Sequence, residues 1–401
     1  MDSLLPPRPL PSTARPPLLL SGDHHHTRLA FPSSSCPAVR LLTLRRRAVA
    51  RPTTADPAAA AADLMVALAE AGDMAGAQSI WAQLLLSSAA PSLAAAAPRL
   101  LPAYARLGHP DEVLLAAREL SARLPSSAAR DIYSLSVSSL GAAGELALME
   151  SAVREMASRF PGGIDSATGN AFVQHYAAFG TLPQMEAAVG RLRRSGTLIS
   201  VAAIRAVASA YISQRKYYRL GEFVSGAGLL RRRDAGNLLW NLYLLSFAAN
   251  FKMKSLQRGF LEMLAAGFRP DLTTFNVRAA AFSKMCMFWD LHLAADHMRR
   301  DGVAPDLVTH GCFVDAYLER RLARNIPFAF RRLGTGAGDE PAVATDGIVF
   351  EAFGKGGFHA SSEAVMEAAC AGGKRRRWTY YSLLDVYLRK QHRKNQIFWN
   401  Y

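Results

Sequence analysis

Two asparagine–aspartate pairs recur in this sequence at one fixed spacing. Asp271 follows Asn241 by 30 residues, and Asp306 follows Asn276 by the same 30. A side-chain amide presents a hydrogen-bond donor beside an acceptor, whereas an ionised carboxylate presents acceptors only. The pairs therefore have the chemistry to bind a polar group through directed hydrogen bonds. Alternatively, the asparagines only pad exposed helix starts and the aspartates, each preceded by proline, serve as N-caps.

The elements that must position these pairs form a tandem repeat. A stretch that opens NLLWNLYLLSF at Asn237 is followed at Leu272 by LTTFNVRAAAF, and the two copies align with a period of 35 residues. Apolar residues recur at helical spacing in each copy, and Gly302 with Pro305 marks an expected helix end. Each copy thus predicts two helices, which can bury their apolar faces only by stacking on neighbouring copies.

The two copies resemble a known repeat family. Their layout x-x-T-[YF]-N … M-x-x-x-G-x-x-P-D is similar to the pentatricopeptide repeat, the 35-residue helical hairpin of plant organelle RNA-binding proteins. The tetratricopeptide unit has 34 residues and a W-x₂-L-G-x₂-Y opening, and neither feature is present here. The resemblance is strong over 237–306 and weaker, but in phase, over much of the rest. It implies an all-α fold, a right-handed α-solenoid of about eight repeats with a C-terminal helical cap.

The resemblance assigns base-reading roles to the two pairs. In this family the fifth and last residues of each repeat read one RNA base, and here these are Asn241 with Asp271 and Asn276 with Asp306. The amide matches the Watson–Crick edge of a pyrimidine, and the carboxylate fixes its orientation directly or through water. Family experience assigns this combination to uridine, so the resemblance implies two adjacent uridine contacts.

A third pair lies upstream. A unit that starts at Ser166 has Asn170 as its fifth residue and Ser200 as its last, which in the family favours cytidine. The unit between, with Arg205 and Gly236, matches no standard pair. Because the family binds RNA 5′ to 3′ along the chain, the resemblance implies a C-n-U-U segment of single-stranded RNA.

Further contacts are implied for stacking and for phosphates. The second residue of each unit wedges between bases in the family; here these are Leu238, Thr273 and Val308, with Ala167 and Ala202 upstream. Aromatic stacking is worth about 1–3 kcal/mol per base, and aliphatic wedges should give less. Each phosphate contact would steepen the salt dependence by about 0.7 units. The candidates, which could equally be solvated charges, are Arg193, Arg194, Arg231, Arg232, Arg233, Lys374, Arg375, Arg376 and Arg377.

The net charge of +15 points to an anionic partner, nucleic acid first and membrane surface second. Residues 1–51 carry eight Arg and two Asp, and residues 374–394 carry eight basic residues and one Asp. These two stretches hold +6 and +7, which leaves about +2 for the middle. The repeats are therefore nearly neutral, and local arginine clusters matter more than the total.

The first 51 residues have the composition of a transit peptide. They are rich in Pro, Ser and Arg and poor in acids, and no unbroken apolar core suggests a secretory signal. The Ser/Pro bias favours the chloroplast stroma, with the mitochondrion as the alternative. The run His24–His26 could bind a metal, but in a segment destined for removal a metal role is disfavoured. The longest uncharged run, Ala235–Phe251, predicts a buried repeat helix and no membrane span.

The remaining chain divides by the quality of its repeats. We predict degenerate repeats over 57–236, two well-formed repeats over 237–306 and a degenerate repeat over 307–341. Residues 342–401 are predicted to form a helical cap with a basic tail, because terminal repeats shield the open end of a stack.

No enzymatic motif supports catalysis. The P-loop pattern is absent, and so are the H-x-E and C-x-x-C zinc ligands of the cytidine-deaminating extension found in related plant proteins. The four cysteines, Cys36, Cys286, Cys312 and Cys370, include no C-x-x-C pair, which argues against a disulfide framework and a zinc site. We expect a non-enzymatic protein without cofactors.

The sequence thus predicts an RNA-binding repeat protein that acts by occupancy. Short arrays with decayed ends resemble the plastid proteins that assist group II intron splicing together with other RNA-binding proteins. RNA stabilisation and translation are close alternatives. A different class, an α-solenoid scaffold that docks helices of an assembly partner, is also compatible with the nearly neutral middle of the chain.

Overall fold

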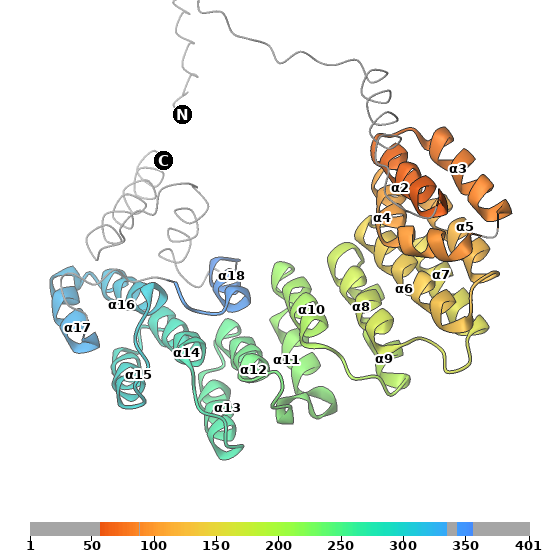
Figure 1. Ribbon diagram of the computed structural model, residues 1–401. Coiled ribbons are helices and arrows are strands. Elements are labelled where there is room, and N and C mark those ends of the chain that lie inside the picture. Colours follow the sequence, from red (N-terminus) through yellow and green to blue (C-terminus); the bar gives the residue numbers. More distant parts are fainter. Residues whose placement is uncertain (1–56, 88, 335–342, 356–401) are drawn as a thin grey trace, which may run out of the picture. The chain divides into compact units, whose positions relative to one another are not determined.

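Helices account for the regular structure of this chain. The computed structural model describes residues 57–87, 89–334 and 343–355, and within these ranges every regular element is helical (Figure 1). The predicted transit peptide, the basic tail with Lys374–Arg377, and most of the predicted C-terminal cap lie outside the described residues. In the described part of the chain, no helix is both long and apolar enough to span a bilayer.

Sixteen of the described helices pair into eight consecutive hairpins, which confirms the predicted all-α solenoid. The short 3₁₀ helix η1 (Gly226–Arg231) follows the fifth hairpin, and η2 (Ala323–Asn325) lies between the two helices of the eighth. Helix α18 (Gly347–Lys355) follows the last hairpin. The hairpins are α2 (Pro57–Glu70) with α3 (Met74–Leu86), α4 (Ala90–Arg106) with α5 (Pro110–Ser121), α6 (Ser126–Ala142) with α7 (Leu146–Arg159), α8 (Ser166–Phe179) with α9 (Leu182–Arg194), α10 (Val201–Ser213) with α11 (Tyr217–Ser225), α12 (Leu238–Ala249) with α13 (Met253–Ala265), α14 (Leu272–Lys284) with α15 (Phe288–Arg300), and α16 (Leu307–Glu319) with α17 (Ile326–Leu333).

Within two series of hairpins, the first helix of each hairpin packs against the first helix of the next. This contact joins α2, α4, α6, α8 and α10 in one series and α12, α14 and α16 in another. Between the two series α12 packs against α11 instead, and α18 contacts α10, α12 and α14 (Figure 1). The fifth hairpin therefore interrupts the regular stacking, and α18 bridges that interruption.

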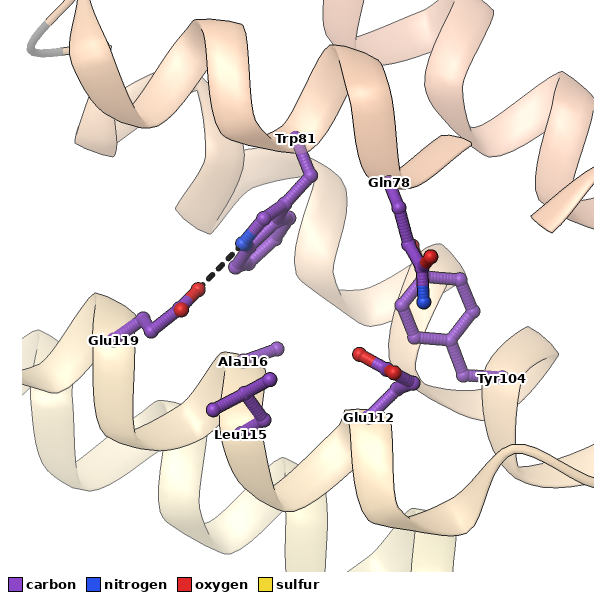
Figure 2. A pocket seen from close by; sticks show the side chains of 7 residues that line it. All are labelled: Gln78, Trp81, Tyr104, Glu112, Leu115, Ala116 and Glu119. Carbon is purple, nitrogen blue, oxygen red and sulfur yellow. Dashed lines mark hydrogen bonds between the residues drawn. The ribbon is translucent and has the colours of Figure 1, made fainter. Parts of the chain in front are cut away.

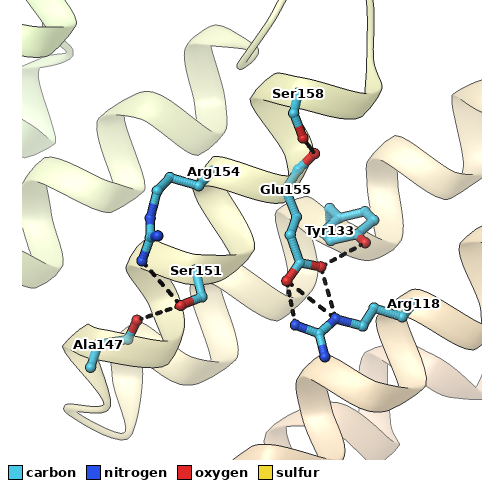
Figure 3. A network of polar contacts seen from close by, with 7 residues as sticks. All are labelled: Arg118, Tyr133, Ala147, Ser151, Arg154, Glu155 and Ser158. Carbon is cyan, nitrogen blue, oxygen red and sulfur yellow. Dashed lines mark hydrogen bonds and ion pairs between the residues drawn. The ribbon is translucent and has the colours of Figure 1, made fainter.

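Polar contacts link the second helices of neighbouring hairpins. Arg118 on α5 forms an ion pair with Glu155 on α7, and the Tyr133 hydroxyl donates to the same carboxylate at 3.2 Å (Figure 3). The hydrogen bonds from Arg118 hold the pKa of Glu155 below its usual value. Arg191, Glu150 and Tyr176 repeat this arrangement between α9, α7 and α8. These pairs are partly exposed to solvent, so each adds about 1 kcal/mol or less and chiefly fixes the register of the stack.

Close packing between α6 and α8 depends on a glycine. The His175 ring lies against Gly141, where an added Cβ would sit 2.2 Å from the ring carbon Cδ2. A helix normally disfavours glycine by about 0.5–1 kcal/mol relative to alanine. At this position, however, only glycine leaves room for the imidazole.

We predict opposite effects for two Gly→Ala substitutions. Gly141→Ala should force α6 and α8 apart and destabilise the protein by about 1–3 kcal/mol, the usual cost of overpacking. Gly190→Ala, in α9, should stabilise it by up to about 1 kcal/mol, because the nearest atom to its added Cβ, from Arg194, is 3.6 Å away. Urea unfolding followed by circular dichroism measures both.

The matched control for Gly141→Ala is the double variant with His175→Ala. Removing the imidazole should recover part of the loss if the steric contact is its cause. Equal stability of the single and double variants would contradict this packing.

Candidate nucleic-acid interface

The Asn241–Asp271 pair is assembled at the start of two neighbouring helices. Asn241 lies in the first turn of α12, and Asp271 is the N-cap of α14. The Asn241 amide nitrogen donates to the Asp271 carboxylate at 3.1 Å. The Thr274 hydroxyl lies 2.6 Å from the Asn241 amide oxygen and 2.8 Å from Asp271 Oδ1, so its one proton is shared between them. The carboxylate and hydroxyl together fix which way the amide points.

One repeat later the same geometry recurs. The Asn276 amide nitrogen donates to Asp306 Oδ1 at 2.8 Å, and the Thr309 hydroxyl lies 2.7 Å from the Asn276 amide oxygen. The structure therefore brings both predicted pairs together. Thr274 and Thr309 were assigned no role from the sequence, although both occupy the threonine position of the repeat layout and share its 35-residue period.

Each of the two aspartates both caps a helix and accepts a hydrogen bond from its asparagine. Asp271 accepts from the backbone N–H of Thr274 at 2.8 Å, and Asp306 accepts from that of Thr309 at 3.0 Å. Each threonine hydroxyl in turn lies 3.2 Å from the backbone nitrogen of its aspartate, which completes a capping box. The N-cap interpretation and the pairing interpretation are therefore both satisfied by one carboxylate.

The upstream pair has different bonds. Asn170 is buried, and its amide oxygen accepts from the backbone N–H of Ser200 at 2.6 Å. The Ser200 hydroxyl instead caps α10 by accepting from Ala203 N–H at 3.1 Å. The amide of Asn170 is oriented by the main chain, and no aspartate takes part in the contact.

The predicted wedge residues fall into two groups. Leu238, Thr273 and Val308 are buried, whereas Ala167 and Ala202 are exposed. Two of the three buried residues, Leu238 and Thr273, lie on α12 and α14, which are two of the three helices that α18 contacts.

A short segment of the same chain lies against the Asn276–Asp306 pair. The Thr345 hydroxyl lies 2.8 Å from the Asn276 amide nitrogen and 2.7 Å from Asp306 Oδ2. The backbone N–H groups of Ala344 and Thr345 also donate to Asp306 Oδ2, at 3.1 and 3.0 Å. With these contacts Asn276 is 0% exposed and Asp306 4% exposed.

Asp346, the next residue of that segment, contacts the repeat that has no standard base-reading pair, through its fifth residue Arg205. Arg205 donates two hydrogen bonds to the Asp346 carboxylate, at 3.0 and 2.6 Å, and Asp346 N–H donates to the Thr273 hydroxyl at 2.9 Å. Burial opposes ionisation of Asp346, but the hydrogen bonds from Arg205 and from the Ile348 N–H, together with the charge of Arg205, hold the pKa of this carboxyl below its usual value. We call the surface formed by Arg205, Asn241, Thr273, Asn276 and Asp306 the first-helix surface.

The candidate phosphate contacts within the described residues are partly engaged. Arg232 forms an ion pair with Asp234 and donates to the Ile199 carbonyl at 2.5 Å. Arg233 donates to the Ala266 carbonyl at 3.1 Å, which caps the end of α13. Arg193 donates to the Phe223 carbonyl at 3.3 Å. Arg194 and Arg231 are exposed, and their phosphate role stays a prediction, as does that of the other three.

A separate cavity of about 290 Å³ lies between α3 and α5 (Figure 2). Trp81 donates to Glu119 at 2.6 Å on one side of it, and Glu112 lines the other. Burial, together with the charge of Glu112, raises the pKa of Tyr104 to about 12. The two carboxylates give this cavity the wrong charge for a phosphate. No cluster of three or more metal-ligating side chains is present among the residues that the structure describes.

We predict that Asp306 supports the fold more than Asp271 does. Asp271→Ala should cost about 1–2 kcal/mol, the loss of a helix cap. Asp306→Ala should cost about 2–3 kcal/mol beyond that, because it also leaves the N–H groups of Ala344 and Thr345 without their acceptor. Chemical denaturation of the two variants measures the difference; equal losses would show that segment 344–346 does not rest on Asp306 in solution.

Comparison with known proteins supports the repeat assignment. No family model matches the chain. A chloroplastic pentatricopeptide repeat-containing protein of Arabidopsis thaliana is 30% identical over 187 residues, which cover 46% of this chain and 37% of that protein. The chain thus spans little more than a third of this curated relative.

Solved structures of one repeat protein are also similar. PPR10 in complex with an 18-nt psaJ RNA element shares 18% identity, with a TM-score of 0.39 over 85% of this chain and 43% of that one. PPR10 from maize shares 18% identity, with a TM-score of 0.29 over 87% of this chain and 58% of that one.

Proposed function

We propose that the chain is a pentatricopeptide repeat protein that binds single-stranded RNA sequence-selectively in the chloroplast. The observation that carries this proposal is the repetition of one Asn–Asp–Thr network, at Asn241 and again at Asn276, on consecutive first helices. A helical-repeat protein that reads one base per repeat needs such an oriented polar group once in each repeat. The chloroplastic relative supports the compartment.

In this proposal the asparagine amides read bases and arginines hold phosphates. Asn241 and Asn276 each contact uridine, and Asn170 contacts cytidine, which gives the C-n-U-U preference. Arg205, which already holds a carboxylate, has the geometry for a phosphate, because a guanidinium donates two parallel hydrogen bonds to either group. The bound protein then acts by occupancy, most directly in group II intron splicing with other RNA-binding proteins.

A scaffold function is the second candidate. One observation favours it: the first-helix surface already holds a helix, α18, from the same chain. A protein partner could present a similar helix there, and such a complex would respond little to salt or to changes of the asparagines.

We predict that Asp271→Ser switches the preferred base at one position. Serine preserves the helix cap, as Ser200 does at α10, but turns the Asn–Asp pair into the Asn–Ser combination of the upstream unit. Binding should shift from C-n-U-U toward C-n-C-U RNA, by about tenfold, which corresponds to about 1.4 kcal/mol. Fluorescence anisotropy with the two RNAs, at several salt concentrations, measures this shift.

The control is the double variant Asn241→Ala with Asn276→Ala. It should lose the preference for uridine while keeping the salt-dependent part of binding. If this variant binds C-n-U-U RNA as tightly as the natural chain does, the base-reading assignment is wrong.

Sequencing of RNA that co-purifies with the tagged protein from chloroplasts tests the biological role. Enrichment of one intron with a C-n-U-U segment in the footprint is the result expected for splicing. Enrichment of an untranslated end would move the role to stabilisation or translation. Recovery of proteins without enriched RNA would favour the scaffold.

A further inference from the structure

Residues 344–353 occupy the part of the first-helix surface where the uridine at Asn276 of the proposed RNA would lie. Helix α18 contacts the first helices of three hairpins, α10, α12 and α14 (Figure 1). Its Val349, Ala352 and Phe353 side chains are fully buried. The segment is therefore seated on this surface through an apolar helix, while the two residues before the helix make directed polar contacts.

Thr345 makes hydrogen bonds with Asn276 and Asp306 of the kind that a base edge would make. Its hydroxyl accepts a hydrogen bond from the Asn276 amide and donates one to Asp306. A pyrimidine edge also presents a donor next to an acceptor. Both hydrogens of the Asn276 amide nitrogen are used in this state, one by Asp306 and one by Thr345. No base can bond to this amide until Thr345 leaves it.

Asp346 likewise makes hydrogen bonds with Arg205, the candidate phosphate contact, and with Thr273, the predicted wedge residue. Its carboxylate takes two hydrogen bonds from Arg205, the arrangement that a phosphate would take. Its backbone N–H donates to Thr273, the residue predicted to wedge between bases. Thr345 and Asp346 thus contact the fifth residues of two repeats, Asn276 and Arg205. They also contact Thr273, the second residue of one repeat, and Asp306, the N-cap residue between repeats.

We propose that residues 344–353 are a built-in competitor of RNA: the segment and the uridine that Asn276 would read exclude each other from the first-helix surface. This inference rests on the proposed RNA binding. The competition is confined to the U-U part of the site, since the Asn170 amide bonds instead to Ser166, Leu198 and Ser200. RNA then reaches the Asn276 amide only after the segment leaves it.

The segment is short enough to be displaced. A helix of nine residues such as α18 is marginal when it stands alone, so its order depends on the surface it covers. When a binding-competent state is only partly populated, the apparent affinity falls by that fraction. Weakening the contacts that hold residues 344–353 on the first-helix surface must therefore tighten RNA binding without any new contact to RNA.

The test is the double variant Thr345→Val with Asp346→Asn. Both substitutions keep side-chain size, and the amide oxygen of the introduced asparagine can still accept from the Ile348 N–H, as the Asp346 carboxylate does at 3.0 Å. We expect C-n-U-U RNA to bind about tenfold more tightly than to the natural chain. The gain should disappear with an RNA in which both uridines are replaced by adenines.

The matched control is Glu351→Gln, which removes one negative charge from the same segment. Asp346→Asn also removes one negative charge. If Glu351→Gln raised the RNA affinity equally, the gain would come from the change in net charge, and the competitor proposal would be wrong. Hydrogen exchange gives a second readout that does not depend on the variant. The N–H groups of Thr345 and Asp346, bonded to Asp306 and Thr273, should be protected in the free protein and should lose protection when RNA binds.

The outcomes separate the two proposals. If RNA binds the natural chain and the double variant equally, and the Thr345 and Asp346 amides stay protected in the complex, the segment is no competitor although RNA binding stands. If no variant binds RNA while these amides are protected, RNA binding is wrong and the segment is a fixed structural part.

Discussion

The two well-formed repeats each depend on one carboxylate that serves two helices. Asp271 closes one repeat and caps the first helix of the next, and Asp306 does the same 35 residues later. Because its backbone bonds fix the carboxylate, the asparagine that donates to it is fixed as well. A helix cap, needed for stability alone, thereby becomes the orienting group of a polar site. The threonine three residues after each aspartate completes both functions.

The repeat period and most helices follow from local patterns, but the placement of α18 does not. Glycine stops, apolar periodicity and the P-D pairs predict α12 and α14 closely, because each signal acts within one hairpin. That Asn276 and Asp306 meet is implied by the resemblance to the pentatricopeptide repeat. By contrast, Arg205 and Asp346 are 141 residues apart, and no local pattern distinguishes Asp346 from any other helix-capping aspartate. Long-range partners of this kind are fixed by tertiary packing, which sequence periodicity does not encode.

The irregular fifth repeat explains where the segment packs. The unit from Val201 to Gly236 is one residue longer than its neighbours and contains η1, and after it α12 packs on α11 instead of on α10. First helices that do not pack directly leave apolar surface for another element to cover, and α18 covers it with Val349, Ala352 and Phe353. The unit whose fifth residue fits no base pairing, Arg205, is the one whose side chain holds the segment.

The same polar bonds limit what else can occupy this surface. Asn276 and Asp306 are buried and fully hydrogen-bonded while Thr345 is present, and buried polar groups cost about 1–3 kcal/mol each when left unpaired. An apolar partner helix would leave them unpaired, together with the Arg205 guanidinium. RNA can replace each lost bond, a base edge for Thr345 and a phosphate for Asp346. The chemistry of the contacts that α18 and its preceding residues make therefore favours a nucleic acid over an apolar helix as the competing ligand.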